Sequence, residues 1–296
     1  MSRDDHAPAY PGFPGAGPDA HVRTIPACAA LGMRQHATLG QPVYATLDAA
    51  LPAVRDADGR IDRGAALVLA DQATAGGVFA SMAQPQPMMT LDLRVDWFAA
   101  LPTGVLACRI DDVTREGDLA FVRARLSSDG APVGAVTARY LVGAMPGGEP
   151  GMDRRTELLP PSDAGSFAAY LDAQLSNEGL TMVPRADHVG GPLPAFHGGV
   201  IAALLEASAI RTLDPALRPL DVETRFLAPA RADRPLATIV TPRRLGRRAA
   251  TIDVAAHQGD PTKPVAIARM LAIADVPGKA QAVELPRGDA FLHRSP

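Results

Sequence analysis

Cysteine is scarce in this sequence of 296 residues, which contains only Cys28 and Cys108. The two are far apart, and neither belongs to a CxxC motif or a Cys/His cluster, so neither a disulfide framework nor a structural zinc site is indicated. Long hydrophobic runs are also missing, because Asp71 and Glu206 interrupt the two most apolar stretches before they could span a bilayer. The first 15 residues contain no apolar signal-peptide core. These absences predict a cytosolic protein that has no membrane partner.

Strong charge of either sign is absent as well. The formal net charge is -3 and no long run of like charge occurs, which excludes the basic field that recruits nucleic acid or an anionic membrane surface. With 47% hydrophobic and 21% charged residues, the chain has the composition of an ordinary globular protein. Its length is sufficient for two domains with their own cores.

The most distinctive stretch is 195–210, which reads AFHGGVIAALLEASAI. It predicts a helix over 198–211 that is apolar on nearly every face and must therefore be buried. His197 takes the N-cap position, while Gly198 and Gly199 allow another molecule to approach first-turn N–H groups that have no partner inside the helix. Glu206 is an ionisable group on this apolar helix, so we expect its pKa to be perturbed.

A second stretch of the same kind lies earlier in the chain. Residues 64–77 predict a buried helix that opens with Gly64 and carries one acid, Asp71. The residues after each helix repeat the same order of alternating strands and turns, and such repetition indicates duplicated units. The matching strand segments are 91–102 and 220–229, 104–113 and 235–242, 115–126 and 245–256, and 132–142 and 264–273.

The repeats predict an α+β fold in which each of two antiparallel sheets wraps one central helix. We expect the two sheets to pair edge to edge, because open sheet edges favour pairing, and we take a single continuous sheet with both helices on one outer face as evidence against this arrangement. Since one chain supplies both units, we expect chains to associate further into homo-oligomers. The expected divisions are a flexible N-terminal arm at 1–20, an N-terminal domain at 21–145, a linker at 146–163, a C-terminal domain at 164–278 and a tail at 279–296.

The HGGVIAALLE segment at 197–206, the strand after it and the RLGR turn at 244–247 resemble the hotdog-fold acyl-CoA thioesterases of the PaaI-like type. The resemblance covers nearly all of residues 40–275, twice. It implies a tandem (double) hotdog fold, hydrolysis of acyl-CoA thioesters to free acid and CoA, and acyl-CoA as the partner, with no metal or organic cofactor. The fold alone does not determine the chemistry.

Any active site must draw on both halves of the chain. A helix rises about 1.5 Å per residue, so Gly198 and Glu206 are about 12 Å apart and cannot act on one carbonyl group. If the two helices pack antiparallel, the N-terminus of each meets the acid of the other. The resemblance then implies a complete site made of the carbonyl-polarising N–H of Gly198 beside His197 and Gly199, the nucleophile or general base Asp71, and the water-placing hydroxyl of Thr90.

The second site is predicted to be degenerate. By position it combines Glu206 with Gly64, and it has lost the other groups. The replacements are Asp62 for the histidine, Arg63 for the first glycine and Pro219 for the threonine. Glu206 is then a relic or a structural hydrogen-bonding group.

The turn at 243–248 is rich in arginine, and the resemblance implies that such a turn lies near the phosphates of CoA. Guanidinium groups suit bidentate contact with phosphate, although turns also collect charged residues that only face solvent. The matching turn of the first half carries Arg115. The predicted CoA-binding residues are Arg243, Arg244, Arg247 and Arg248.

Two other functions stay open. One is a non-catalytic acyl-CoA-binding module, in which Asp71 is dispensable. The other is a hotdog hydratase or dehydratase of enoyl or hydroxyacyl thioesters, which needs a catalytic histidine paired with the acid. The helix-cap position of His197 favours the thioesterase. Taken singly, His197 suits a cap and Thr90 an ordinary strand, whereas an acid inside a buried helix such as Asp71 rarely lacks a partner.

Overall fold

The structure is a computed structural model that describes residues 17–38, 41–84, 86–143, 157–191 and 194–274. The predicted tail at 279–296 and residues 146–156 of the predicted linker lie outside these ranges. Helix α1 (Pro18–Val22) begins inside the predicted N-terminal arm, because Val22 is fully buried and Asp19 pairs with Arg34. Residues 18–20 are therefore helical, and the domain boundaries stay predictions.

The first half of the chain contains one long helix followed by four long strands, as predicted. Its helices are α1, α2 (Pro26–Ala30) and α3 (Arg63–Ala80), with a 3-10 turn η1 (Pro52–Val54). Two strands precede α3, namely β1 (Arg34–His36) and β2 (Tyr44–Asp48). The four that follow are β3 (Met88–Trp97), β4 (Val105–Glu116), β5 (Leu119–Ser128) and β6 (Ala131–Val142).

The second half repeats this plan. The short elements α4 (Phe167–Leu171), β7 (Ala173–Leu175), β8 (Leu180–Met182) and the 3-10 turn η2 (Ala186–His188) lead to the central helix α5 (Gly198–Ile210). The strands after α5 are β9 (Leu217–Phe226), β10 (Leu236–Leu245), β11 (Ala249–His257) and β12 (Ala266–Ala274). The repeat read from the sequence is therefore a repeat of structure.

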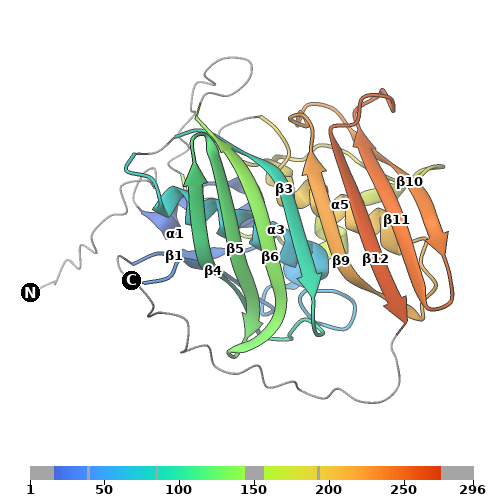
Figure 1. The fold of residues 1–296 in the computed structure, drawn as a ribbon, viewed down its shortest axis with the longest axis horizontal. Coiled ribbons are helices and arrows are strands. Elements are labelled where there is room, and N and C mark those ends of the chain that lie inside the picture. The colour runs from blue at the N-terminus through green and yellow to red at the C-terminus, as the bar shows by residue number, and fades with distance from the viewer. Residues whose placement is uncertain (1–16, 39–40, 85, 144–156, 192–193, 275–296) are drawn as a thin grey trace, which may run out of the picture.

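The strands form one antiparallel sheet. From either outer edge to the centre, the strands of the first half and the corresponding strands of the second half follow in the same order. The order is β1-β2-β4-β5-β6-β3-β9-β12-β11-β10-β8-β7, and each half contributes one contiguous side of the sheet (Figure 1). The two sides meet where β3 pairs antiparallel with β9, with Arg94 opposite Glu223 at the centre. The edge-to-edge pairing predicted from the sequence is confirmed.

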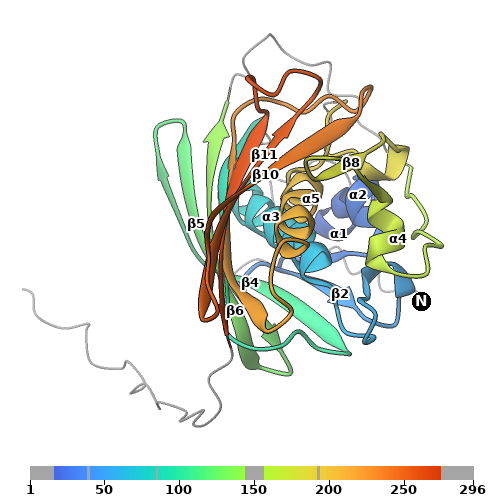
Figure 2. The same ribbon diagram turned by 90° about the vertical axis from the view of Figure 1, so that its right-hand side faces the viewer.

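Both central helices lie on the same face of this continuous sheet, which curves around them (Figure 2). We expected that a continuous sheet with both helices on one outer face would argue against two sheets that each wrap one helix. The expectation that continuity of the sheet excludes this arrangement was wrong. When two sheets that each curl around a helix join at their edges, both helices necessarily lie on the shared concave side. Helices α1, α2 and α4 cover α3 and α5 on the side away from the sheet (Figure 2). No helix in the described ranges is long and apolar enough to cross a membrane.

The central helices pack antiparallel and very closely. A Cβ atom added to Gly199 would lie 2.4 Å from the Cα atom of Val68, so only glycine permits this approach. Farther along the contact, the N-terminal end of α3 reaches the Glu206 region of α5, where Arg63 pairs with Glu206. Each helix N-terminus therefore meets the acid-bearing part of the opposite helix, as the sequence predicted.

A β-bulge occurs at the same place in each half. The register between β3 and β6 shifts between Thr90 and Asp92, so that Leu91 has no partner in β6. In the second half, Asp221 and Pro219 pair with successive residues of β12, and Leu220 is the residue left out. A bulge changes which side chains of a strand face inward. In β3 it aligns Thr90 with the inward-facing, buried Tyr140 and so turns Thr90 toward α3.

Candidate active site

Asp71 is a buried carboxylate held by groups from both halves of the chain. It lies in the middle of α3 and is 4% exposed. The backbone N–H of Gly199, in the first turn of α5, donates to Oδ2 of Asp71 at 2.8 Å, and Thr90 Oγ1 donates to Oδ1 at 2.9 Å. A carboxylate at a helix N-terminus is stabilised by the unpaired N–H groups and by the helix dipole. The structure thus brings Asp71, Thr90 and Gly199 together.

His197 is the N-cap of α5, as predicted, and its ring lies beside Asp71. The Nδ1 atom accepts a hydrogen bond from the N–H of Gly199 at 3.0 Å and lies 3.3 Å from Oδ2 of Asp71. Burial lowers the pKa of His197, and the charge of Asp71 opposes this shift. The ring is therefore neutral at neutral pH and serves as a cap.

Gly198 leaves the site open on one side. It is half-buried, as is Thr90, whereas His197 and Gly199 are buried. Within the described residues, the N–H of Gly198 has no hydrogen-bond acceptor. A Cβ added here would lie 2.6 Å from Oδ2 of Asp71. A carbonyl oxygen can therefore approach this N–H next to the carboxylate only because residue 198 is glycine.

Tyr140 and Thr74 hold the backbone of α3 at Asp71. The hydroxyl of Tyr140 donates to the carbonyl oxygen of Asp71 at 2.9 Å and lies 2.7 Å from Oγ1 of Thr74. Tyr140 and Thr74 are fully or almost fully buried. Neither residue stands out in the sequence, because a tyrosine on an alternating strand and a threonine in an apolar helix are both typical of a core.

The second predicted site has a different geometry. Glu206 is buried, and its Oε1 atom accepts from Nε of Arg63 at 3.2 Å instead of from a backbone N–H. Burial raises the pKa of Glu206 to about 7, with the charge of Arg63 acting against the shift. The prediction that the pKa of Glu206 is perturbed agrees with this environment.

The N-terminus of α3 is already occupied. Asp62, the N-cap, accepts the N–H of Gly64 at 2.7 Å, and burial raises the pKa of Asp62. The ring of Phe167, from α4, covers Gly64 so closely that an added Cβ would lie 2.3 Å from Cε1 of that ring. An anionic cap and an aromatic ring thus occupy the N-terminus of α3, whereas the N-terminus of α5 has Asp71 and the half-buried Gly198.

The four arginines of the 243–248 turn do not lie with Asp71. They are exposed at the C-terminal end of α5, and the 13 residues of α5 separate this end from Gly198, a length of about 20 Å. Arg243 pairs with Asp253 through Nε at 2.7 Å. The structure therefore keeps the turn as a separate surface.

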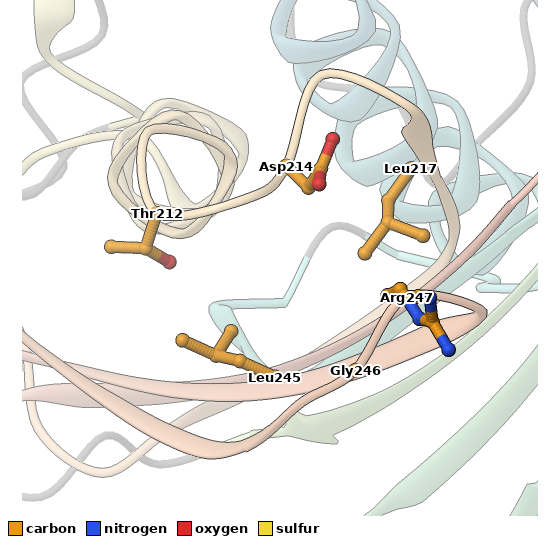
Figure 3. Close-up of a pocket in the computed structure, with 6 residues that line it drawn as sticks. All are labelled: Thr212, Asp214, Leu217, Leu245, Gly246 and Arg247. Carbon is orange, nitrogen blue, oxygen red and sulfur yellow. The ribbon is translucent and has the colours of Figure 1, made fainter.

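A cleft with a volume of about 260 Å³ lies beside this turn (Figure 3). One wall comes from the segment after α5 and the first residue of β9, and the other comes from the end of β10 and the turn. Of the four predicted arginines, only Arg247 lines this cleft. The lining residues are Thr212, Asp214, Leu217, Leu245, Gly246 and Arg247.

No set of three or more His, Cys, Asp or Glu side chains in the described ranges is arranged to hold a metal ion. The site at Asp71 does include two residues that the sequence analysis missed. Cys28 of α2 lies next to His197, with Sγ 3.5 Å from His197 Nε2, and Gln72 of α3 contacts Cys28, with Oε1 3.5 Å from Sγ. The scarcity of cysteine excludes only a disulfide framework. No sequence motif contains both Cys28 and His197, so their contact could not be predicted from the sequence.

Comparison with known families and structures supports the resemblance in its general form. Residues 190–273 match the model of the acyl-CoA thioesterase N-terminal domain. No curated protein sequence matches the chain. The matched residues contain α5, the HGG segment and all four strands that follow, whereas Asp71 and Thr90 lie outside the match.

Solved structures share the fold at low sequence identity. The tesB protein of Mycobacterium avium subspecies paratuberculosis has a TM-score of 0.57 at 12% identity, over 84% of this chain and 98% of that one. A 12:0-ACP thioesterase of Umbellularia californica has a TM-score of 0.55 at 11% identity, over 78% and 94%. A protein of unknown function with a hotdog fold from Alicyclobacillus acidocaldarius has a TM-score of 0.51 at 12% identity, over 84% and 98%.

These likenesses confirm the predicted α+β hotdog fold, while the PaaI-like type stays a prediction. Residues 190–273 are similar to the acyl-CoA thioesterase N-terminal domain, in a chain that has the hotdog fold, and this similarity supports a thioester hydrolase.

Proposed function

We propose that the chain hydrolyses acyl-CoA thioesters to free acid and CoA at one composite site. The site consists of Asp71 and Thr90 from the first half and the N-terminus of α5 from the second. The observation that carries the proposal is the 2.8 Å hydrogen bond from the N–H of Gly199 to Asp71, which joins a helix N-terminus to a buried carboxylate across the two halves.

The groups present match the needs of thioester hydrolysis. The thioester carbonyl oxygen accepts the N–H of Gly198, where the positive end of the α5 dipole stabilises the oxyanion that forms in the transition state. Asp71 removes a proton from water as the water oxygen bonds to the carbonyl carbon, or attacks that carbon itself before water releases the acid. Collapse of the intermediate breaks the C–S bond, and the thiolate of CoA leaves and takes up a proton. Thr90 orients Asp71 through Oδ1.

The geometry of His197 argues against the hydratase alternative. A hydratase needs an imidazole nitrogen that faces the substrate. Here Nδ1 accepts from Gly199 and Nε2 lies against Cys28. Both ring nitrogens are therefore occupied inside the protein, which suits a cap.

A substrate panel tests the proposal. Purified protein is incubated with acyl-CoAs of different chain length and with aromatic acyl-CoAs, and released thiol is measured with a chromogenic disulfide reagent. An acyl thioester of an acyl carrier protein is included, because one structural neighbour is a 12:0-ACP thioesterase. Thiol release that requires Asp71 supports the proposal. Tight binding of acyl-CoA without release by the wild type would instead indicate a binding module.

Three broader predictions accompany this proposal. We propose that the protein works in the cytosol, that the 243–248 turn contacts the phosphates of CoA, and that chains form homo-oligomers. Sedimentation that shows only a 30.8 kDa monomer would contradict the last of these.

A further inference from the structure

Cys28 lies directly beneath the histidine that caps α5. The side chains of Cys28 and His197 are buried, and they come from elements far apart in sequence. Sγ of Cys28 lies 3.5 Å from Nε2 of His197 and 3.5 Å from Oε1 of Gln72. Gln72 directly follows Asp71 in α3, so the three side chains connect the α5 cap back to the helix that carries the acid.

When Nδ1 of His197 accepts from Gly199, the hydrogen bonds among these side chains follow one direction. Nδ1 of His197 accepts from the N–H of Gly199, so in the neutral ring the proton is on Nε2. The Nε2–H group then donates to Sγ of Cys28, and the thiol hydrogen of Cys28 donates to Oε1 of Gln72, which is an acceptor only.

We propose that Cys28 and Gln72 are positioning residues that hold His197 in the Nε2–H tautomer, and so keep the Asp71 carboxylate free of the imidazole. The inference rests on the proposed function of the Asp71 site. Neither residue touches the substrate, and both act through His197.

The other tautomer would change the site at Asp71. A proton on Nδ1 would lie between Nδ1 and Oδ2 of Asp71, which are 3.3 Å apart, and the ring would donate to the carboxylate. Nδ1 could then no longer accept the N–H of Gly199. The carboxylate would lose reactivity toward water or a thioester, while the surfaces that bind the substrate would not change. A tautomer defect therefore lowers kcat and leaves KM unchanged.

The order Cys28–His197–Asp71 resembles that of a cysteine nucleophile, but the geometry excludes this role. Cys28 is fully buried, so no substrate reaches Sγ. Burial, and next the charge of Asp71, raises the pKa of the Cys28 thiol, which keeps it protonated. A nucleophile would also need Nδ1 of the histidine to donate to the acid, whereas here it accepts from Gly199.

The tautomer can be measured directly. Ring-¹⁵N-labelled histidine distinguishes the Nε2–H from the Nδ1–H form by NMR, and the variant His197→Asn identifies the resonances of His197. We expect the Nε2–H form in the wild type and in Cys28→Ser, whose hydroxyl also accepts and donates. Cys28→Ala and Gln72→Leu should each populate the Nδ1–H form. An unchanged Nε2–H form in both of these variants would overturn the proposal, whatever the activity.

Kinetics provide the second readout, with a matched control. Cys28→Ala should lower kcat by about 3- to 10-fold, the effect of one lost hydrogen bond, with KM unchanged, and Cys28→Ser should restore most of kcat. Cys108 is also fully buried, in β4, so Cys108→Ala leaves a similar void and should leave kcat unchanged. An equal loss in Cys108→Ala would show a general packing effect and overturn the proposal.

Failure of the proposed function gives a different pattern. If Asp71→Asn retained full turnover, Asp71 would not be the base or nucleophile, yet the tautomer measurement on Cys28→Ala would still be valid. If Cys28→Ala does not fold, Gln72→Leu provides the same test, because it removes the acceptor of the Cys28 thiol hydrogen.

Discussion

The two helix N-termini differ in the groups that neutralise them, and this difference supports the proposal that only the α5 end is catalytic. At α5 the cap is His197, which is neutral, so the positive end of the helix is available to Asp71 of the opposite half. At α3 the cap is the carboxylate of Asp62, and the opposite acid, Glu206, is paired with Arg63 instead. The N-terminus of α3 is thus satisfied by its own charged cap, Asp62. The N-terminus of α5 depends on Asp71, which comes from the other half of the chain.

Access separates the two ends as well. The half-buried Gly198 opens the α5 end, whereas Phe167 covers Gly64 at the α3 end. This difference in access supports the proposal that only the α5 end receives substrate.

The largest expected difference lies between the two acids. Asp71→Asn keeps the size of the side chain and removes the base or nucleophile, so kcat for thiol release should fall by about 10²-fold or more. Glu206→Gln should cost far less, because the cap at Asp62 and the ring of Phe167 already close that end. Steady-state kinetics on both variants measure this. Loss of turnover in Glu206→Gln with normal turnover in Asp71→Asn would reverse the assignment of the two sites.

The glycines at the two helix ends should differ next. A Cβ at Gly199 would meet the backbone of Val68, so Gly199→Ala forces the helices apart, at a cost of about 1–3 kcal/mol in stability and a loss in kcat that approaches 10²-fold. A Cβ at Gly64 would meet the ring of Phe167 and the Cβ of Ala203 instead of helix backbone, at a distance from Asp71, so Gly64→Ala should keep most of kcat. Thermal unfolding and kinetics on both variants check this, and equal losses of kcat would contradict the asymmetry.

Thr90 provides a hydroxyl that the other half lacks, since Pro219 stands at its place. Thr90→Val removes the hydrogen bond to Asp71 and keeps the shape, so kcat should fall by about 10-fold. Thr90→Ser should retain most of the activity, because the hydroxyl remains. If Thr90→Val and Thr90→Ser behave alike, the hydroxyl has no part in the reaction.

The arginine turns of the two halves can be compared through binding. If the 243–248 turn contacts CoA phosphates, replacing Arg243 and Arg247 with Ala should raise KM severalfold more than it lowers kcat. The attraction should also weaken with salt, because the Debye length is about 10 Å at 0.1 M. Arg115→Ala tests the equivalent turn between β4 and β5. An unchanged KM in the double variant would leave the 243–248 turn as solvated surface.

Glu206 should show its effect in stability rather than in turnover. Its pKa is about 7 in the folded protein against 4.5 as the ordinary value, so the folded state binds this proton more tightly than the unfolded state. Its contribution to stability is therefore present below the unfolded value and is lost as pH rises toward 7, by at most about 3 kcal/mol. Unfolding midpoints at acidic and mildly alkaline pH should fall more with rising pH in the wild type than in Glu206→Gln. Equal pH dependence in the two proteins would contradict this account.

The repeated order of helix and strands could be predicted from the sequence because local patterns produce it. An all-apolar helix has to be buried, alternating residues form strands, and the two halves use the same patterns in the same order. The match between Asp71 and Glu206 follows from the same repeat, and it predicts both the antiparallel helix pair that the structure contains and the composite site that we propose.

The sequence by itself determined the two buried helices, the acids on them and the loss of one glycine and one hydroxyl from the second site. Tertiary structure decided the rest. Simple alternation along β3 would turn Leu91 inward and Thr90 outward, and the bulge reverses this, so that Thr90 reaches Asp71. Contacts between distant segments also brought Cys28 beneath His197 and Phe167 onto Gly64. No local pattern encodes such contacts, because they depend on how separate elements pack against one another.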